Sequence, residues 1–311
     1  MIEVRKLSKH YHHLIAVDAL SFTVEPGEVL GFLGPNGAGK TTSMRMLAGF
    51  ITPTAGDALI FGNSVCDQPL AVKRRIGYLP EGAPLYDDMT PLQFLRFIAR
   101  IWGIPAAKEA AAIDSVVSTL GLANVLHQPI ETLSKGYRRR VGLAQAIVHD
   151  PQVLILDEPT DGLDPNQKHE VRQLIRTLAN EKIVIVSTHI LEEVEAVCSR
   201  AIIIANGRIC ADDTPTALCQ LSPQHNAVTL CFALDTSAAR LLSMADTLAN
   251  SGIAAAVKTD ADNLTITALA ANGQAIIQDI NKLVRQQDWQ PLQCRLETGK
   301  LEDVFRSVTT P

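Results

Sequence analysis

Short apolar runs without polar interruption mark the N-terminal part of the chain. They cover residues 29–33, 153–156, 183–186 and 201–205. A run of this kind predicts a strand that is buried on both faces, as in a parallel sheet. Ligands bind at the carboxyl ends of such strands, so the polar residues that directly follow these runs are candidates for one common site.

The segment after the first run has the pattern G-x-x-x-x-G-K-[ST] and leads into a predicted helix at 43–48. Between a strand and a helix, this pattern predicts a phosphate-binding loop, because its glycines allow tight turns and its backbone N–H groups point inward. The N-terminus of the helix adds partial positive charge. We expect Lys40 to reach the outer phosphates and the Thr41 hydroxyl to ligate magnesium. The predicted loop comprises Gly34, Pro35, Asn36, Gly37, Ala38, Gly39, Lys40, Thr41 and Thr42.

Two carboxylates and a histidine follow the later apolar runs. Asp157 and Glu158 come directly after one run, and we expect Asp157 to hold magnesium through water and Glu158 to orient or polarise an attacking water. His189 lies beyond the next run, at the same predicted edge of the sheet, where it is a candidate contact for the outermost phosphate. The alternative is that these strands simply end at the surface, and the phosphate-binding loop elsewhere in the chain disfavours it.

Residues 2–33 are predicted to form strands joined by turns. Tyr11 lies among them, and two interpretations stay open: it stacks on a base, or it is a half-buried strand tyrosine. Asn206-Gly207 separates the last apolar run from residues 208–211 and predicts a β-hairpin.

Residues 90–150 have a helical pattern. The first helix begins with a capping box, in which Thr90 caps, Pro91 suits the first helical position and Gln93 completes the box. A later helix begins at Ser134, which is a natural N-cap. The free backbone N–H groups of the first turn of this helix form an anion site. Its first turns carry the basic run 138–140, which opposes the helix dipole, so we expect a nearby anion or acidic partner. The alternative is an ordinary capped helix with a basic start.

The pattern changes after a linker at residues 221–226. Strands and helices then follow in the order β-α-β-β-α-β, which is the order of a ferredoxin-like unit, and an amphipathic segment at 301–308 ends the chain. We therefore predict two domains, residues 1–221 and 222–311. The second has no catalytic constellation and is expected to serve folding or docking. Its predicted strands are 228–233, 253–257, 264–269 and 291–296, and its helices 238–250 and 275–286.

Composition narrows the class of protein. The chain has 311 residues, 47% hydrophobic and 20% charged, which supports packed domains and argues against disorder. Its net charge of -5 argues against nucleic acid as the main partner. The six cysteines are scattered without metal-ligand spacing, as in a cytosolic chain with free thiols. The N-terminus does not resemble a secretory signal, and no apolar run approaches the length of a bilayer span, so a membrane role is expected to require a partner.

Taken in order, the motifs of residues 1–221 resemble an ATP-binding cassette (ABC) nucleotide-binding domain. The fold that this implies is α/β, with a RecA-like P-loop core, an antiparallel β subdomain and an α-helical subdomain. The resemblance rests on Tyr11, Gly34 to Thr42, Gly77 to Glu81, Leu133 to Tyr137, Leu156 to Thr160, Asp161 to Asp164 and Ser187 to His189.

The resemblance implies a head-to-tail homodimer that encloses two ATP molecules. Each would lie between the phosphate loop of one subunit and Ser134, Lys135, Gly136 and Tyr137 of the other, so the anion expected near that helix would be the partner's γ-phosphate. Tyr11 would stack on the base.

The resemblance also implies residue roles in catalysis. Glu158 would be the catalytic base and His189 the γ-phosphate switch, beside Lys40 on the phosphates. Mg²⁺ would be held by Thr41, Asp157 and Glu81, and residues 161–164 would link the two sites.

Two departures from the family pattern point to one branch. The usual signature is Leu-Ser-Gly-Gly-Gln, and here Lys135 and Tyr137 replace the first glycine and the glutamine, whereas Gly136 is kept. Glu81 stands where the family usually has glutamine, which adds a charge but still allows binding to magnesium or water. With the small C-terminal domain, these departures are similar to the ATPases of bacterial exporters for multidrug export, sodium export or gliding motility.

The resulting hypothesis is an ATPase subunit that docks on separate membrane permease subunits and powers export. It would be cytoplasmic and peripheral on the inner face of the plasma membrane, with residues 80–100 receiving a cytoplasmic helix of the permease. The alternative is a soluble, non-transport ABC ATPase that acts on nucleic acid or ribosomes, but such proteins usually carry long coiled coils or two cassettes. A nucleotide-binding regulator without turnover is disfavoured because Lys40, Asp157, Glu158 and His189 are all present.

Overall fold

The computed structural model describes residues 1–234 and 236–309. The chain forms two compact units, Met1–Thr214 and Pro215–Pro311, and each is described by itself. Residues 310 and 311, the end of the predicted C-terminal domain, lie outside the described residues.

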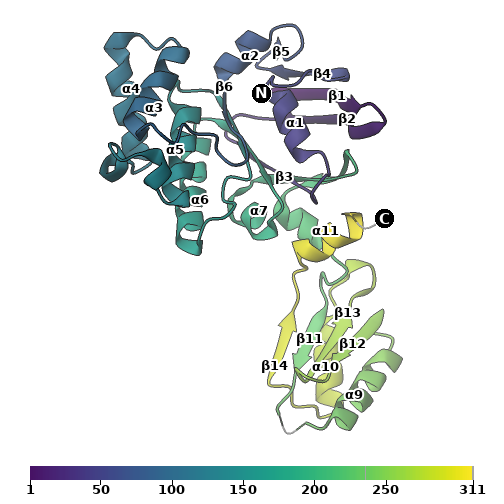
Figure 1. Cartoon of the computed structure of the whole chain (residues 1–311). Helices are drawn as coiled ribbons and strands as arrows, with labels where there is room; N and C mark the ends of the chain where they lie inside the picture. Colours follow the sequence, from purple (N-terminus) through teal and green to yellow (C-terminus); the bar gives the residue numbers. More distant parts are fainter. Residues whose placement is uncertain (235, 310–311) are drawn as a thin grey trace. The chain divides into compact units, whose positions relative to one another are not determined.

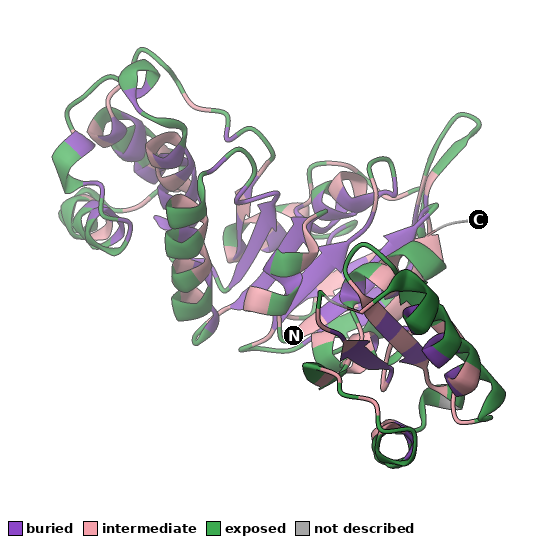
Figure 2. Cartoon of the chain, turned by 90° about the horizontal axis from the view of Figure 1, so that it is seen from below, coloured by how far each residue is buried: buried purple, intermediate pink, exposed green. Residues whose placement is uncertain are grey.

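A six-stranded sheet forms the centre of the first unit, in the order β10-β9-β3-β8-β7-β6. Its strands run parallel from β9 to β6, and β10 pairs antiparallel with β9 through the predicted hairpin. The parallel sheet that the apolar runs predict is therefore confirmed, and its central strands are coloured as buried in Figure 2. The strands are β3 (Val29–Leu33), β6 (Ile76–Leu79), β7 (Val153–Asp157), β8 (Ile183–Thr188), β9 (Arg200–Ala205) and β10 (Arg208–Asp213).

A second, antiparallel sheet accompanies this core, in the order β2-β1-β4-β5. Tyr11 and Leu14 form the last pair of the β1–β2 hairpin, which confirms strands over most of the first 33 residues. The strands are β1 (Ile2–Tyr11), β2 (Leu14–Val24), β4 (Ala55–Ile60) and β5 (Asn63–Ser64).

The helical pattern of residues 90–150 resolves into separate helices, and Figure 1 shows α3, α4 and α5 grouped together in the first unit. The capping box predicted for α3 is present, with both reciprocal hydrogen bonds of Thr90 and Gln93. Gly103 and Gly121, with φ angles of +70° and +62°, lie in the breaks that divide the segment. The helices of this unit are α1 (Lys40–Leu47), α2 (Pro69–Arg75), α3 (Pro91–Ile101), α4 (Ala106–Thr119), α5 (Lys135–Ile147), α6 (Pro165–Ala179) and α7 (Leu191–Val197), with short 3₁₀ turns at Ala123–Val125 and Ile130–Thr132.

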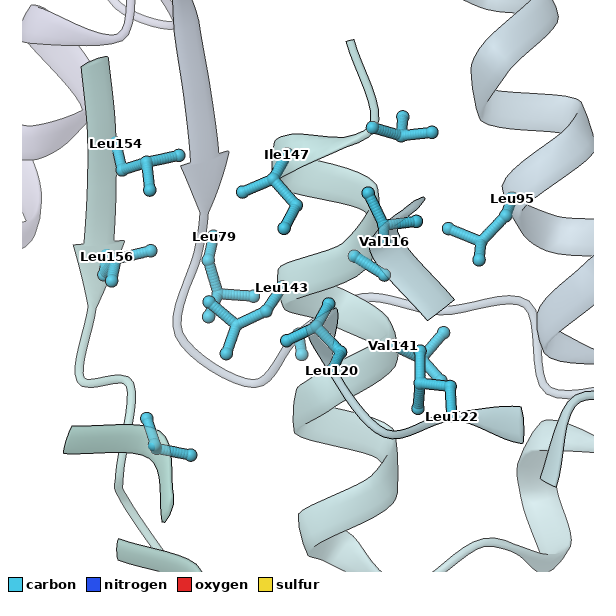
Figure 3. Packing of buried hydrophobic residues seen from close by; sticks show 14 of the residues in the cluster. Leu79, Leu95, Val116, Leu120, Leu122, Val141, Leu143, Ile147, Leu154 and Leu156 are labelled. Carbon is cyan, nitrogen blue, oxygen red and sulfur yellow. The ribbon is translucent and has the colours of Figure 1, made fainter. Parts of the chain in front are cut away.

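Hydrophobic clusters cover both faces of the central sheet, because successive strand residues point to opposite sides. Leu154 and Leu156 of β7 belong to the cluster that includes α5, and Figure 3 shows them facing the side of Leu143 and Ile147. Ile155, between them in sequence, packs in the cluster on the opposite face. Burial on both faces explains why these strands are uniformly apolar.

The second unit contains an antiparallel sheet in the order β12-β13-β11-β14 with its own core. It begins ahead of the predicted boundary at 221, because α8 packs with α11. The predicted sequence of strands and helices is present, although β12 begins later than expected, since Ala256 is the first residue paired with β13. The elements are α8 (Pro215–Gln220), β11 (Val228–Cys231), α9 (Ala238–Asn250), β12 (Ala256–Asp260), β13 (Thr265–Leu269), a 3₁₀ turn (Ala271–Gly273), α10 (Ile277–Gln286), β14 (Gln293–Leu296) and α11 (Leu301–Thr309).

Across the described residues of both units, none of the helices combines the length and apolar character that crossing a membrane requires.

Candidate active site

The register of the central sheet brings the predicted site residues to one edge. Asp157, at the end of β7, lies opposite Ser187 of β8, and Leu33, at the end of β3, lies opposite Thr188. The glycine-rich loop follows β3, the carboxylates end β7 and His189 follows β8. Segments that are far apart in sequence therefore converge because their strands run parallel.

The glycine-rich loop curls tightly before α1. Gly39 has a φ of +103°, and a Cβ there would lie 2.4 Å from the backbone oxygen of Ala16. No side chain caps the N-terminus of α1, so its first N–H groups remain available. Free N–H groups at a helix N-terminus favour an anion, as the sequence predicts for this loop.

Lys40 is folded back across this loop. Its Nζ donates to the backbone oxygens of Gly34 at 2.7 Å and Pro35 at 3.3 Å, and lies 3.8 Å from Oε1 of Glu158. The side chain is 7% exposed, and burial lowers the pKa of Lys40, while Glu158, Asp157 and Glu81 oppose that shift. A buried cation whose nearest carboxylate oxygen is 3.8 Å away is suited to pairing with an anion of greater charge.

Asp157 has the surroundings of a magnesium ligand. It is fully buried; its Oδ1 accepts a hydrogen bond from the Ser187 hydroxyl and lies 3.5 Å from the Thr41 hydroxyl. Its Oδ2 has no hydrogen-bond partner among the described residues. An unpartnered buried carboxylate oxygen beside a hydroxyl fits Mg²⁺, which takes oxygen ligands and keeps waters and phosphates as the others.

Glu158 and His189 form a hydrogen-bonded pair in the site, with Glu158 beside Lys40. Nδ1 of His189 lies 3.0 Å from Oε2 of Glu158. Burial raises the pKa of Glu158, against the lowering effects of His189 and Lys40. A carboxylate with a raised pKa is a better proton acceptor, as a general base requires. Glu158 also has a φ of +49°, a conformation uncommon for non-glycine residues and often found at functional sites.

Arg139 of α5 fixes the backbone that carries these carboxylates. Its guanidinium donates to the backbone oxygens of Asp157 at 2.8 Å and Pro159 at 2.9 Å, and also to that of Glu158. The side chain is 6% exposed, and burial lowers its pKa. The helix that begins at Ser134 is thus tied directly to the loop after β7.

Glu193 of α7 bonds to two threonines at the same edge. The Thr160 hydroxyl donates to its Oε1, and the Thr188 hydroxyl donates to its Oε2 at 3.0 Å. All three residues are buried.

A cavity of about 520 Å³ brings most of the predicted residues together. Tyr11, a residue that is 42% exposed, contributes from the end of β1, and the Lys9 ammonium lies 5.2 Å from its ring centroid. Glu81 lines the cavity from the loop after β6. The lining residues are Tyr11, Leu14, Ile15, Ala16, Pro35, Asn36, Gly37, Gly39, Lys40, Thr41, Thr42, Glu81, Glu158, Asp161 and His189.

The predicted residues 134–137 do not line this cavity. The Ser134 hydroxyl caps α5 by accepting from the N–H of Tyr137 at 3.4 Å, and Ser134 and Lys135 are exposed. The acidic partners that the basic run predicts are present within the chain: Arg138 pairs with Asp87 at 2.6 Å, and Arg140 pairs with Glu170. The partner's γ-phosphate is therefore not needed to explain these arginines.

Several site residues escaped the sequence analysis. Leu14 and Ile15 offer exposed apolar surface beside Tyr11, and alternation in a strand gave no reason to select them. Arg139 had a signal in the basic start of its helix, but its target did not follow from the sequence. No sequence signal pointed to Glu193, because it is one of several acidic residues in a short helix.

The model of the family described as "ABC transporter" matches residues 17–161. An uncharacterized ABC transporter ATP-binding protein, YhcH of Bacillus subtilis (strain 168), is 42% identical over 212 residues, which cover 67% of this chain and 68% of that protein. The Nod factor export ATP-binding protein I of Paraburkholderia xenovorans (strain LB400) is 40% identical over 218 residues, covering 70% of this chain and 72% of its own length.

A solved structure has the same fold as the first unit. The dimeric structure of a bacterial ABC transporter cassette matches with a TM-score of 0.64, covering 69% of this chain and 99% of its own. Its sequence identity is 22%, so the likeness concerns the fold.

Proposed function

Because this chain belongs to the ABC transporter family, as an ATP-binding subunit that hydrolyses ATP, we propose that it drives export of a substrate through a separate membrane permease. The single observation that carries the assignment of roles is the cavity in which Lys40, Glu158 and His189 converge from three strand ends. The exported substrate would be selected by the permease.

ATP would enter the cavity with its phosphates at the N-terminus of α1. The glycine-rich loop and Lys40 would bind the phosphates, and the exposed ring of Tyr11 would stack on the base beside Leu14 and Ile15. Thr41 and Asp157 would hold Mg²⁺ together with Glu81, and the ion, when bound, neutralises charge on the outer phosphates.

Hydrolysis would use the Glu158–His189 pair. Glu158 would orient the attacking water and accept its proton, which its raised pKa favours. His189 has a side chain that is 46% exposed, so its ring remains accessible to the γ-phosphate while Nδ1 contacts Glu158. Lys40 would stabilise the charge that develops on the transferred phosphoryl group.

We propose that two copies assemble head to tail around two ATP molecules. Residues 134–137 lie outside the cavity of their own chain, with an exposed start to α5, as expected if they complete the site of a partner. The similar cassette of known structure is a dimer, which supports this arrangement.

The permease would dock on the region predicted at 80–100. Tyr86 and Phe97 are 52% and 38% exposed there and contact each other edge to face at 5.6 Å between ring centroids. Exposed aromatic residues are typical of protein interfaces. This docking would place the chain on the cytoplasmic face of the membrane through its partner, and the net charge of -5 gives no reason to expect nucleic acid.

We propose that residues 222–311 form a ferredoxin-like accessory domain that follows the cassette of residues 1–221. Its strands and helices follow the order β-α-β-β-α-β, and its sheet is antiparallel with the first strand in an inner position. It would serve folding or docking rather than chemistry.

Purification from membranes tests the transport role. We expect the full chain with a C-terminal tag to recover a polytopic membrane protein, identified by mass spectrometry. A Phe97→Asp variant should lose this protein because a charge at the docking surface is costly to bury, yet it should still bind ATP. Recovery of ribosomes or nucleic acid without a membrane protein would favour the non-transport alternative.

A further inference from the structure

The buried carboxylate of Glu193 links the two loops that carry the catalytic pair, Glu158 and His189. Glu158 lies in the loop after β7, and His189 follows β8, so their 3.0 Å contact depends on how two separate segments are held. Glu193 comes from a third element, α7, and accepts hydrogen bonds from both segments.

The two donors stand next to the catalytic residues. Thr188 directly precedes His189, and Thr160 follows Glu158 by two positions. The Thr188 hydroxyl accepts a hydrogen bond from the N–H of Ile190 at 3.0 Å, which leaves its own proton to be donated to Glu193. Each of the two hydrogen bonds to Glu193 therefore restrains the backbone next to Glu158 or His189.

Burial of the Glu193 carboxylate costs free energy, because it removes a charged group from water. Glu193 is 4% exposed, and among the ion pairs of the described residues none involves it. Two hydroxyl donors must therefore offset much of the cost of desolvating a charge. An apolar side chain could fill the same space at lower cost, but it could not fix two hydroxyl groups at a defined separation.

We propose that Glu193 is a positioning residue for ATP hydrolysis, which fixes the contact between Glu158 and His189 by bonding Thr160 and Thr188. This inference rests on the ATPase function proposed above. It predicts an effect on the chemical step rather than on nucleotide binding, because Lys40 and the glycine-rich loop do not contact Glu193 in any hydrogen bond of the described residues.

The first test is Glu193→Gln in the full chain, assayed for MgATP hydrolysis. The amide keeps the size of the side chain but leaves one acceptor oxygen, so one threonine hydroxyl loses its acceptor and must turn to accept from the NH2 group. We expect kcat to fall about ten- to a hundredfold, as small misplacements of catalytic groups do, with KM for ATP within about twofold. Glu192→Gln, the same change at an exposed position of the same helix, should hydrolyse like wild type.

A double-mutant cycle separates positioning from a general loss of structure. Thr188→Val should lower kcat, and adding Glu193→Gln should lower it little further, because both changes weaken the same link between the segments that carry Glu158 and His189. ATP-binding stoichiometry corrects each rate for the folded fraction. Unchanged kcat in Glu193→Gln, losses that multiply in the double variant, or a loss fully explained by the folded fraction would each overturn the proposal. Hydrolysis by wild type separately reports the ATPase function, and an inactive wild type would overturn both.

Discussion

Nζ of Lys40 and Oε1 of Glu158 lie 3.8 Å apart in a buried part of the site, and the proposed mechanism gives each residue a different role. The cation has backbone oxygens as its nearest partners, so it is free to exchange them for phosphate oxygens. Burial of the Glu158 carboxylate raises its pKa and so favours its taking up a proton, although His189, which holds it in place, opposes this shift. In the proposed mechanism, phosphate binding therefore falls to Lys40 and proton transfer to the neighbouring Glu158.

Lys40→Ala should weaken ATP binding about a hundredfold, since a charged hydrogen bond to an anion contributes up to about 3 kcal/mol. Isothermal titration with ATP measures the effect. Lys108→Ala removes an exposed lysine of α4 and should bind like wild type. Tight ATP binding by Lys40→Ala would contradict the role given to this loop.

The pH dependence of hydrolysis reports the state of Glu158. The base acts when ionised, so kcat should fall as the pH drops through its pKa. Burial raises that pKa above the ordinary 4.5, and the acidic limb should lie correspondingly higher. A kcat that stays flat down to pH 4.5 would exclude Glu158 as the base with the environment described here.

The sequence predicted the position of some site residues but not of others. The convergence of Asp157 and His189 was predictable, because they lie at the ends of neighbouring strands and parallel strands bring such ends together. Arg139 and Glu193 act on backbone or side chains far away in the sequence, and no local pattern encodes the direction of a buried side chain. Their roles required the packed structure.

At the scale of elements, α5 links two parts of the machinery. Its N-terminus carries Ser134, expected to face a partner's ATP, and Arg139 farther along the same helix holds the backbone of Asp157 and Glu158. A shift of this helix would therefore move the loop that carries the base. The sequence predicted the start of α5 from its cap, whereas α7 lacks a side-chain cap and spans Leu191–Val197, so no signal marked it.

His149, which follows the C-terminal end of α5, allows a test of how the stability of the fold depends on pH. The His149 ring stacks on Trp102, the residue after α3, at 3.9 Å between centroids, and burial lowers the pKa of His149 from 6.5 to about 4. The unfolded chain therefore binds a proton near pH 6.5 that the folded chain does not bind until about pH 4, so stability is lost as the pH falls across this window.

His149→Phe should keep the stacking and remove this pH dependence, on the order of 2 kcal/mol in the free energy of unfolding between pH 7 and 4. Urea unfolding followed by Trp102 fluorescence measures it, in a Trp289→Phe background that removes the tryptophan of the second unit. His127→Gln changes an exposed histidine and should retain the wild-type pH dependence. Equal pH dependence in His149→Phe and the background chain would refute the assignment.

At the scale of the whole molecule, one chain holds half of each proposed catalytic site. The cavity contains the phosphate-binding loop, Glu158 and His189, while residues 134–137 lie outside it. The sequence predicted an α/β cassette from its ordered motifs and a smaller domain from a change of pattern. The packing of α8 with α11 did not follow from a local pattern, because it joins residues at the two ends of the second unit.

The most direct test is the mass of the Glu158→Gln chain with and without MgATP, measured by light scattering after gel filtration. We predict a monomer of 33.6 kDa without nucleotide and a dimer with MgATP, because ATP binds but is not hydrolysed. Ser134→Asp keeps a good N-cap but places a negative charge where the partner's γ-phosphate would lie, so it should prevent the dimer. A Glu158→Gln chain that binds MgATP yet stays monomeric, or a dimer that Ser134→Asp leaves intact, would contradict the head-to-tail ATPase.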